Sequence, residues 1–259
     1  MKTLYINASP KRRWSNSGYF MGYARLFTGG DKCKLPRNGK YDEVLGAIDE
    51  SDTVVLALPL YVDGIPSHVL RFLQAWEEHI ARSGHTVKLY IIANCGFYEG
   101  CQTHILIDQM RMWCKQAGVE FTGALGIGAG EMLGILRLTP FIRLAISLII
   151  TLITAAVGLM NGSISLSALW HGVGITSVFI SLGVAALFSL CAAIRLFQLA
   201  VDIRKHRQHK VNYTTVWFCP RFLFAFFTAL YWYIRMLVMH GVMPWKAFNR
   251  ADLPLQLAK

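Results

Sequence analysis

The sequence predicts an α/β protein in which a parallel β-sheet, covered by helices on both faces, is followed by an α-helical membrane region. Over the first half of the chain, short apolar runs alternate with amphipathic helical patterns, which is typical of such a sheet. The second half contains 51 consecutive residues without Lys, Arg, Asp or Glu, between Arg143 and Arg195. The hydrophobic fraction of 54% and the mean hydropathy of +0.40 are high for a protein without lipid contact.

Five strands and four helices are expected to alternate in the first 130 residues. The strands are expected at residues 3–7, 32–35, 53–58, 87–93 and 121–127, and the helices at 16–27, at 41–50, from Pro66 onward and at 102–117. Pro66 suits the start of a helix because its fixed backbone dihedral fits the first turn. The alternating order predicts an open parallel sheet with helices on both faces.

Three loops of this sheet have unusual compositions. In parallel α/β sheets, ligands bind beyond the carboxyl ends of the strands, so we expect these loops to converge on one crevice. Residues 7–18 bring hydroxyls and cations to a helix N-terminus, which favours a phosphate site. An ordinary N-cap at Ser15 or Ser17 beside a solvated basic loop explains the same residues equally well. Residues 59–66 and 94–100 combine glycine with aromatic side chains, which suits a flat ring.

Residues 1–130 resemble the flavodoxin-like NAD(P)H-dependent FMN reductases. The matching motifs are Ala8-Ser9-Pro10-Lys11 with Ser15-Asn16-Ser17, then Pro59-Leu60-Tyr61 with Gly64-Ile65-Pro66, and finally Asn94-Cys95-Gly96. The resemblance implies a flavodoxin-like five-stranded sheet of order 2-1-3-4-5 and a noncovalently bound FMN. A homodimer is one expectation from the resemblance, but Leu70, Gln74 and Ala75 stand where the family often has a lysine and an Asp-Arg pair, so the usual dimer contacts differ here.

The resemblance further implies which side chains hold FMN. Those near its phosphate would be Ser9, Lys11, Ser15, Asn16 and Ser17. Those near the isoalloxazine edge at N5 would be Pro59, Leu60, Tyr61 and Gly64, and those near the far ring edge Asn94, Gly96, Phe97 and Tyr98. Because hydride transfer from NAD(P)H is chemistry of the cofactor, we expect no catalytic acid or base and no metal site.

The uncharged stretch predicts a transmembrane hairpin. The small and polar residues 161–167 divide it into spans at about 140–160 and 173–193, each near the ~20 residues that a bilayer requires. Two buried helices of a soluble core are the alternative. Basic residues 204–210 follow the second span, and Lys and Arg are enriched on the cytoplasmic side of membrane proteins. We therefore expect a protein of the cell membrane with both hairpin ends and the N-terminal domain in the cytoplasm. We expect this basic run to bind membrane lipid rather than nucleic acid.

These features predict three parts of the chain: an FMN-binding domain at 1–132, the hairpin at 133–204, and a basic juxtamembrane segment with an aromatic helix at 205–259. Within the last part, residues 222–242 are expected to form a helix on the cytoplasmic face of the membrane. A third transmembrane span is the alternative.

The functional hypothesis is a membrane-anchored, FMN-dependent NAD(P)H oxidoreductase that reduces a quinone, a flavin or a redox protein. A flavin-bound electron carrier and a cofactor-free flavodoxin-like scaffold are the alternatives. The six cysteines are expected to be free thiols, although Cys95 and Cys101 could form a redox or metal pair. His68 and His79 are expected to be surface residues of the helix that begins near Pro66.

Overall fold

The computed structural model describes most of the N-terminal half of the chain and part of the C-terminal half. The described residues are 2–11, 14–61, 64–130, 132–133, 190–216, 222, 225–226, 228–230 and 233. The chain divides into two compact units, Met1–Phe218 and Cys219–Lys259. The second unit is helical at its described positions, and every element below belongs to the first.

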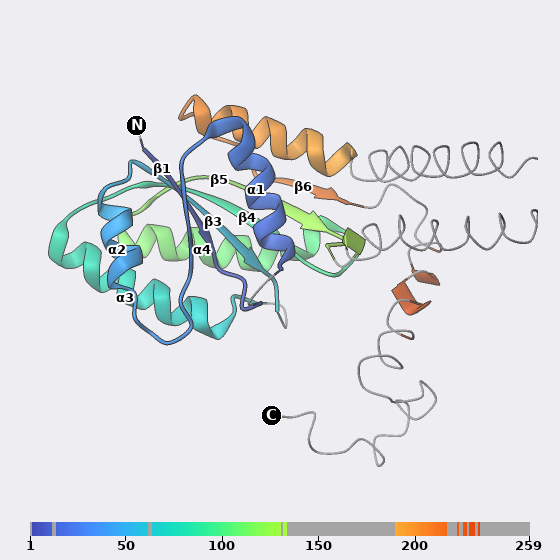
Figure 1. Cartoon of the computed structure of the whole chain (residues 1–259), viewed down its shortest axis with the longest axis horizontal. Coiled ribbons are helices and arrows are strands. Elements are labelled where there is room, and N and C mark those ends of the chain that lie inside the picture. The colour runs from blue at the N-terminus through green and yellow to red at the C-terminus, as the bar shows by residue number, and fades with distance from the viewer. Residues whose placement is uncertain are drawn as a thin grey trace, which may run out of the picture. The chain divides into compact units, whose positions relative to one another are not determined.

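The first unit alternates strands and helices (Figure 1). The strands are β1 (Thr3–Asn7), β2 (Asp31–Lys34), β3 (Thr53–Pro59), β4 (Lys88–Asn94), β5 (Glu120–Gly128) and β6 (Asn212–Thr215). The helices are α1 (Asn16–Thr28), α2 (Asp42–Asp49), α3 (Ser67–Ser83), α4 (His104–Ala117), the 3-10 turn η1 (Gly100–Thr103) and an additional helix at 190–204. The predicted order of the first five strands and four helices is confirmed, with ends within two residues.

All neighbouring strands are parallel, and the sheet has the order β2-β1-β3-β4-β5-β6. The order of the first five strands is the flavodoxin-like one. The prediction of five strands was wrong by one, because Asn212–Thr215 adds a sixth strand beside Leu125–Gly128. This short strand lacks a run of apolar residues, so hydrophobic periodicity could not reveal it.

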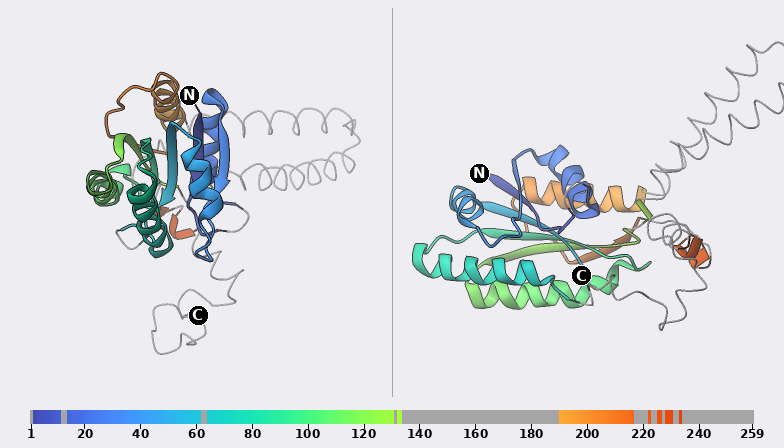
Figure 2. Two further views of the ribbon diagram at one scale, coloured as in Figure 1. Left: turned by 90° about the vertical axis from the view of Figure 1, so that its left-hand side faces the viewer. Right: turned by 60° about the horizontal axis from the view of Figure 1, so that its bottom comes forward.

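Helices cover both faces of the sheet (Figure 2). One face carries α1 and the 190–204 helix, whose buried side chains include Phe20 and Leu199. The other face carries α2, α3 and α4. The buried side of α3 consists of apolar residues at helical spacing, namely Val69, Phe72, Leu73 and Trp76.

The 190–204 helix extends the α/β unit beyond the expected limit at residue 132. Ala192, Leu196 and Ile203 are each at most 2% exposed, because this helix packs on the sheet and leads into β6. The expected span at 140–160 and most of the one at 173–193 lie outside the described residues. Among the residues that the structure describes, no helix is both long and apolar enough to cross a bilayer.

The basic run at 204–210 lies at the amino edge of the sheet, where the strands begin. The Tyr90 hydroxyl donates to the Arg207 carbonyl at 2.6 Å, and the His209 N–H donates to the Thr122 carbonyl at 2.8 Å. This position differs from the expected one directly after a membrane span. Because β6 is parallel to β5, the run that precedes β6 lies at the edge where the strands begin. The 15-residue helix before the run is about 22 Å long, so it separates the run from Leu190 by about that distance.

Candidate functional site

The three loops singled out in the sequence meet at the carboxyl edge of the sheet, where the strands end. The registers Asn7 to Ala57 and Pro59 to Asn94 place the ends of β1, β3 and β4 side by side. A crevice of ≈40 Å³ opens between these loops. Its lining consists of Ser9, Lys11, Asn16, Ser17, Pro59, Leu60, Tyr61, Asn94, Cys95 and Gly96.

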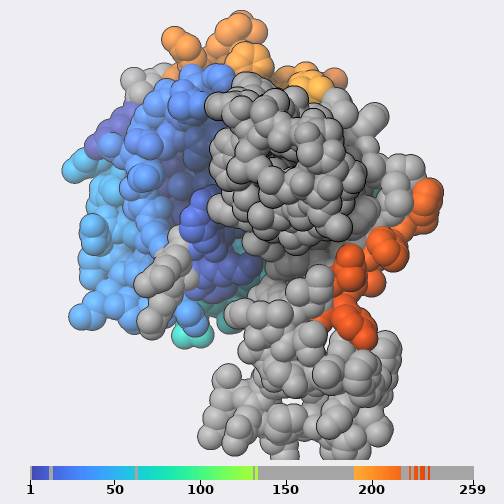
Figure 3. Space-filling model, turned by 45° about the vertical axis from the view of Figure 1, so that its right-hand side comes forward, coloured from blue at the N-terminus to red at the C-terminus, as the bar shows by residue number. Residues whose placement is uncertain are grey.

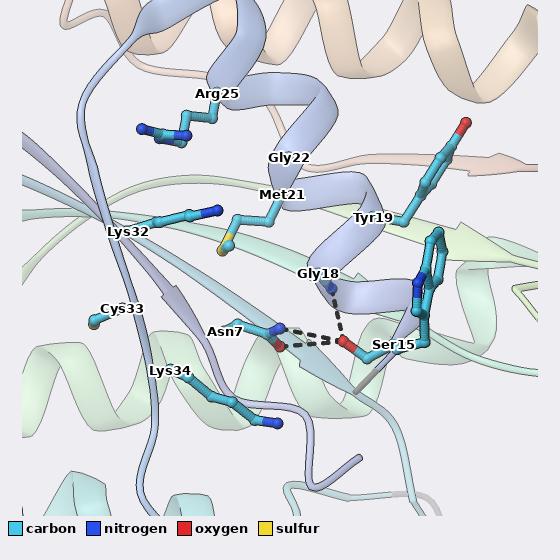
Figure 4. A pocket seen from close by; sticks show the side chains of 11 residues that line it. Asn7, Ser15, Gly18, Tyr19, Met21, Gly22, Arg25, Lys32, Cys33 and Lys34 are labelled. Carbon is cyan, nitrogen blue, oxygen red and sulfur yellow. Dashed lines mark hydrogen bonds between the residues drawn. The ribbon is translucent and has the colours of Figure 1, made fainter. Parts of the chain in front are cut away.

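Asn7 organises the first loop. Its Oδ1 accepts the Ser9 N–H at 3.0 Å, and its Nδ2 donates to Ser15 Oγ at 3.2 Å. Ser15 Oγ also accepts the Gly18 N–H at 3.1 Å and is the N-cap of α1 (Figure 4). The capping interpretation of Ser15 is therefore correct. Asn7 was missed among the candidate residues because an Asn at the end of a strand is a common turn residue.

A buried hydrogen bond joins the first loop to the third. Ser17 Oγ donates to Asn94 Oδ1 at 2.6 Å, and the two residues are 1% and 5% exposed. The Ser17 hydroxyl proton is used inside the protein, so this residue positions α1 against the end of β4. A ligand at the N-terminus of α1 would still meet the first-turn N–H groups, which have no partner within the helix.

The middle loop is held by backbone hydrogen bonds. The Leu60 N–H donates to the Asn94 carbonyl at 2.8 Å, and Tyr61 and Gly64 pair through bonds of 3.3 and 3.2 Å. Pro66 is the N-cap of α3, and its carbonyl accepts the Val69 N–H. Proline has no backbone N–H, but no helical hydrogen bond needs one at the start of a helix, so the helix loses no hydrogen bond. The Tyr61 side chain is 43% exposed at the rim of the crevice.

Cys95 lines the crevice and was not among the candidate residues. Its thiol faces the carbonyl oxygens of Phe97 and Glu99, at 3.8 and 3.6 Å. Burial raises the pKa of the Cys95 thiol to about 11, so it is protonated near neutral pH. All five cysteines that the structure describes are free, and no described group of three His, Cys, Asp or Glu residues could hold a metal ion.

His68 supports the first loop, although it was expected to be a surface residue. Its Nε2 lies 2.9 Å from the Ala8 carbonyl oxygen, because the first turn of α3 passes beside the end of β1. The sequence placed His68 on an amphipathic helix but gave no sign of this partner. His79 contacts Asp49 at 2.8 Å near the opposite edge of the sheet.

The crevice brings together nine of the candidate FMN-binding residues and leaves four outside its lining. The four are Ser15, Gly64, Phe97 and Tyr98. Ser15 caps α1, and Gly64 closes the middle loop against Tyr61. Phe97 is 55% exposed beside the crevice, and the backbone of Tyr98 packs against β5, since a Cβ on Gly128 would lie 2.3 Å from its carbonyl oxygen.

A basic groove lies next to the first loop, between α1 and β2 (Figure 4). It has a volume of ≈420 Å³, and its cations are Arg25, Lys32 and Lys34. Trp14 and Tyr19 line it at the start of α1. The groove and the crevice share the first loop, so the positive potential of the groove extends to the crevice.

The donor set at the crevice fits a flavin mononucleotide. Hydroxyl and amide groups of Ser9 and Asn16, the Lys11 cation and the N-terminus of α1 suit a phosphate dianion. Backbone amides of two rigid loops and the exposed rings of Tyr61 and Phe97 suit the edge and face of a tricyclic ring. The strand order and the crevice define a flavodoxin-like α/β domain.

Comparison with known proteins gives partial matches. No family model matches the chain. A protein of Saccharophagus degradans named FMN-dependent NADH:quinone oxidoreductase is 34% identical over 68 residues, 26% of this chain and 31% of the relative. A protein of the same name from Cellvibrio japonicus is 31% identical over 109 residues, 35% of this chain and 52% of the relative. The chain thus spans about half, or less, of the curated relatives that it matches.

Two solved structures are similar over half of the chain. The Trp repressor binding protein of Bacillus subtilis is 18% identical with a TM-score of 0.41, and the match covers 49% of this chain and 84% of that structure. An NADPH-quinone reductase from P. pentosaceus is 16% identical with a TM-score of 0.41, covering 50% and 86%.

Proposed function

We propose that the protein is a membrane-anchored, FMN-dependent NADH:quinone oxidoreductase. The observation that carries the proposal is the convergence of three loops, distant in sequence, on one crevice at the carboxyl edge of a flavodoxin-like sheet. Both sequence relatives carry that activity in their names, and the aligned segments support the same chemistry here.

Bound FMN would accept a hydride from NADH and pass electrons to a quinone. The protein's own residues would bind and orient the cofactor. Ser9, Lys11 and Asn16 would hold the phosphate at the start of α1, where the helix dipole favours an anion. Pro59, Leu60 and Tyr61, which line the crevice, would contact the ring system.

A nicotinamide-dependent reductase is favoured over a flavin-bound electron carrier by the charge of the first loops. Residues 1–41 contain nine Lys and Arg and a single acidic residue, Asp31. Flavodoxin carriers tend to be acidic, whereas a cationic surface beside the crevice attracts the phosphates of a dinucleotide.

Membrane anchoring is the second part of the proposal. It is supported by the 51 uncharged residues between Arg143 and Arg195, which suffice for two spans of ~20 residues each. The α/β domain would then lie in the cytoplasm, where NADH is available. Retention of the full chain in membranes after alkaline carbonate extraction would support this part, and release into the supernatant would contradict it.

The proposal is tested by purifying the full chain in mild detergent and recording its visible absorption spectrum. We expect flavin bands, release of about one FMN per chain on denaturation, and NADH oxidation that depends on added quinone. The Lys11→Ala variant should bind FMN roughly tenfold more weakly or worse, since a charge-assisted contact is lost. Lys115→Ala, on α4, is the matched control. A colourless protein that does not take up added FMN would contradict the proposal.

A homodimer is also proposed, in line with the resemblance of the first 130 residues. The mass of the protein in detergent, measured by light scattering with the detergent contribution subtracted, distinguishes a dimer from a monomer.

A further inference from the structure

The chain leaves and re-enters the α/β unit at the same edge of the sheet. Leu133 follows β5, and the Gly130 N–H before it donates to the Cys95 carbonyl at 2.8 Å, next to the crevice. Leu190 begins a helix that ends at the amino edge, because this helix leads into β6, which runs parallel to β5. Leu133 and Leu190, the described residues that flank segment 134–189, therefore both lie at the carboxyl edge.

Four exposed apolar side chains lie at this edge. Trp14 is 59% exposed, Tyr61 43%, Phe97 55% and Leu190 49%. They come from three loops and one helix start that are far apart in the sequence. Aromatic side chains of this kind are enriched where proteins meet the headgroup region of a bilayer.

The same edge carries a positive surface. Lys11 follows β1, and Lys34, Arg37 and Lys40 end β2 or follow it, and all four are exposed. Two exposed acidic residues, Asp42 and Glu43, follow them at the start of α2. Figure 3 shows the blue N-terminal part of the chain at the surface of the molecule. The basic groove with Arg25 and Lys32 continues this surface along α1.

The opposite edge has a different composition. Asp31, Glu50, Asp52 and Glu120 lie at or next to the starts of β2, β3 and β5. The cations of the 204–210 run are interspersed with them, and this run is fixed to the sheet about 22 Å from Leu190. An anionic surface would be attracted to the carboxyl edge more strongly than to this mixed edge.

We infer that the carboxyl edge of the sheet, with the crevice, lies against an anionic bilayer surface, and that the electron acceptor is a quinone dissolved in the lipid. The part on the acceptor rests on the proposed function. NADH would give up a hydride, two electrons with one proton, and leave as NAD⁺. The quinone would take up these two electrons, that proton and one proton from water, and leave as the quinol. An acceptor in the lipid then reaches the crevice without crossing the aqueous phase.

The orientation is tested by lysine acylation, read by mass spectrometry, on the full-length protein. The protein is compared in nanodiscs of phosphatidylcholine with phosphatidylglycerol and in detergent, at low ionic strength. We expect Lys34 and Lys40 to react several-fold more slowly in the nanodiscs, while Lys115 and Lys205 react at the same rate in both. Equal rates at Lys34 and Lys40, or protection of Lys205 instead, would overturn the orientation.

The acceptor is tested with two double charge reversals at opposite edges. In anionic proteoliposomes, Arg37→Glu with Lys40→Glu should lower the reduction rate of a long-chain quinone several-fold and leave a short, water-soluble quinone unaffected. The control, Arg204→Glu with Lys205→Glu, should leave both rates unchanged. Equal loss in the two double variants would overturn the inference.

The two experiments separate the inference from the proposed function. Protected Lys34 and Lys40 in a protein that does not oxidise NADH would retain the orientation and contradict the function. Unprotected lysines in an active NADH:quinone oxidoreductase would retain the function and contradict the orientation.

Discussion

Ser17 and Asn94 join two segments that are 77 residues apart in the sequence, and their hydrogen bond fixes the geometry of the crevice. Both side chains are buried, so neither can exchange its partner for water without local opening. The bond holds the first turn of α1 at the end of β4. Asn7 and His68 also form hydrogen bonds to the loop between β1 and α1, Asn7 with Ser15 and His68 with the Ala8 carbonyl.

Ser17→Ala should destabilise the protein. The substitution leaves Asn94 Oδ1 buried without its donor, which costs about 1–3 kcal/mol. Thermal unfolding in detergent should show a midpoint lower by about 2–4 °C per kcal/mol. Ser67→Ala, at an exposed position, should change the midpoint little, and an unchanged midpoint for Ser17→Ala would contradict the importance of the bond.

Cys95 should resist alkylation in the folded protein. Its pKa is raised by burial from 9.0 to about 11, so at pH 8 the thiolate is about 100-fold scarcer than in the unfolded chain. Iodoacetamide labelling followed by mass spectrometry should give a correspondingly slow rate, while the exposed Cys101 reacts readily. Rapid labelling of Cys95 at pH 8 would contradict the protonated thiol and favour the redox-pair alternative.

The same shift has a consequence for stability at high pH. A raised pKa in the folded state means that the contribution of Cys95 is fully present below pH 9 and is lost as the pH rises toward 11. Cys33 and Cys114 are shifted in the same direction, also by burial. The free energy of unfolding should therefore decrease through this range.

At the level of elements, β5 owes its glycines to close packing. A Cβ on Gly126 would lie 2.2 Å from Thr103 Oγ1 and 2.6 Å from Tyr213 Cδ1, in η1 and β6. β6 and η1 pack against β5 at these positions.

Gly126→Ala should destabilise the β5–β6 edge. Overpacking of this kind costs about 1–3 kcal/mol. Gly22→Ala is the matched control, because its added Cβ meets nothing within 4 Å and alanine favours the helix by up to about 1 kcal/mol. Thermal unfolding should therefore shift in opposite directions, and a Gly126→Ala protein as stable as the parent would contradict the close packing.

Most of the first five strands and four helices could be predicted from the sequence because they have a clear hydrophobic period. The exception is β2, in which Asp31, Lys32 and Lys34 are exposed. The 190–204 helix was hidden, since its first buried residue, Ala192, belongs to an uncharged stretch that is typical of a membrane span. Most crevice residues could be predicted because motifs mark their loops. Asn7, His68 and Cys95 could not, since their roles depend on partners that only the folded chain brings near.

At the scale of the whole molecule, the α/β unit is built from two separate pieces of chain, one before residue 134 and one after residue 189. Replacing 134–189 by a short Gly/Ser linker should give a water-soluble protein with a complete sheet. A chain that ends at 132 should aggregate, because Leu199 and Ile203 no longer cover the sheet. Solubility and circular dichroism check both outcomes, and a well-folded 1–132 fragment would contradict this division.

The position of the apolar segment between β5 and the 190–204 helix also sets the order of events on the ribosome. At about 5–20 residues per second, synthesis of 134–189 takes about 3–11 s, during which the first five strands are made but the last helix and strand are not. Tyr90 and Ile92 are fully buried in the folded protein, but during that interval the 190–204 helix is not yet present to cover this face of the sheet. The α/β unit is therefore completed only after its apolar segment has been synthesised, so final folding of the sheet follows synthesis of residues 134–189 in every newly made chain.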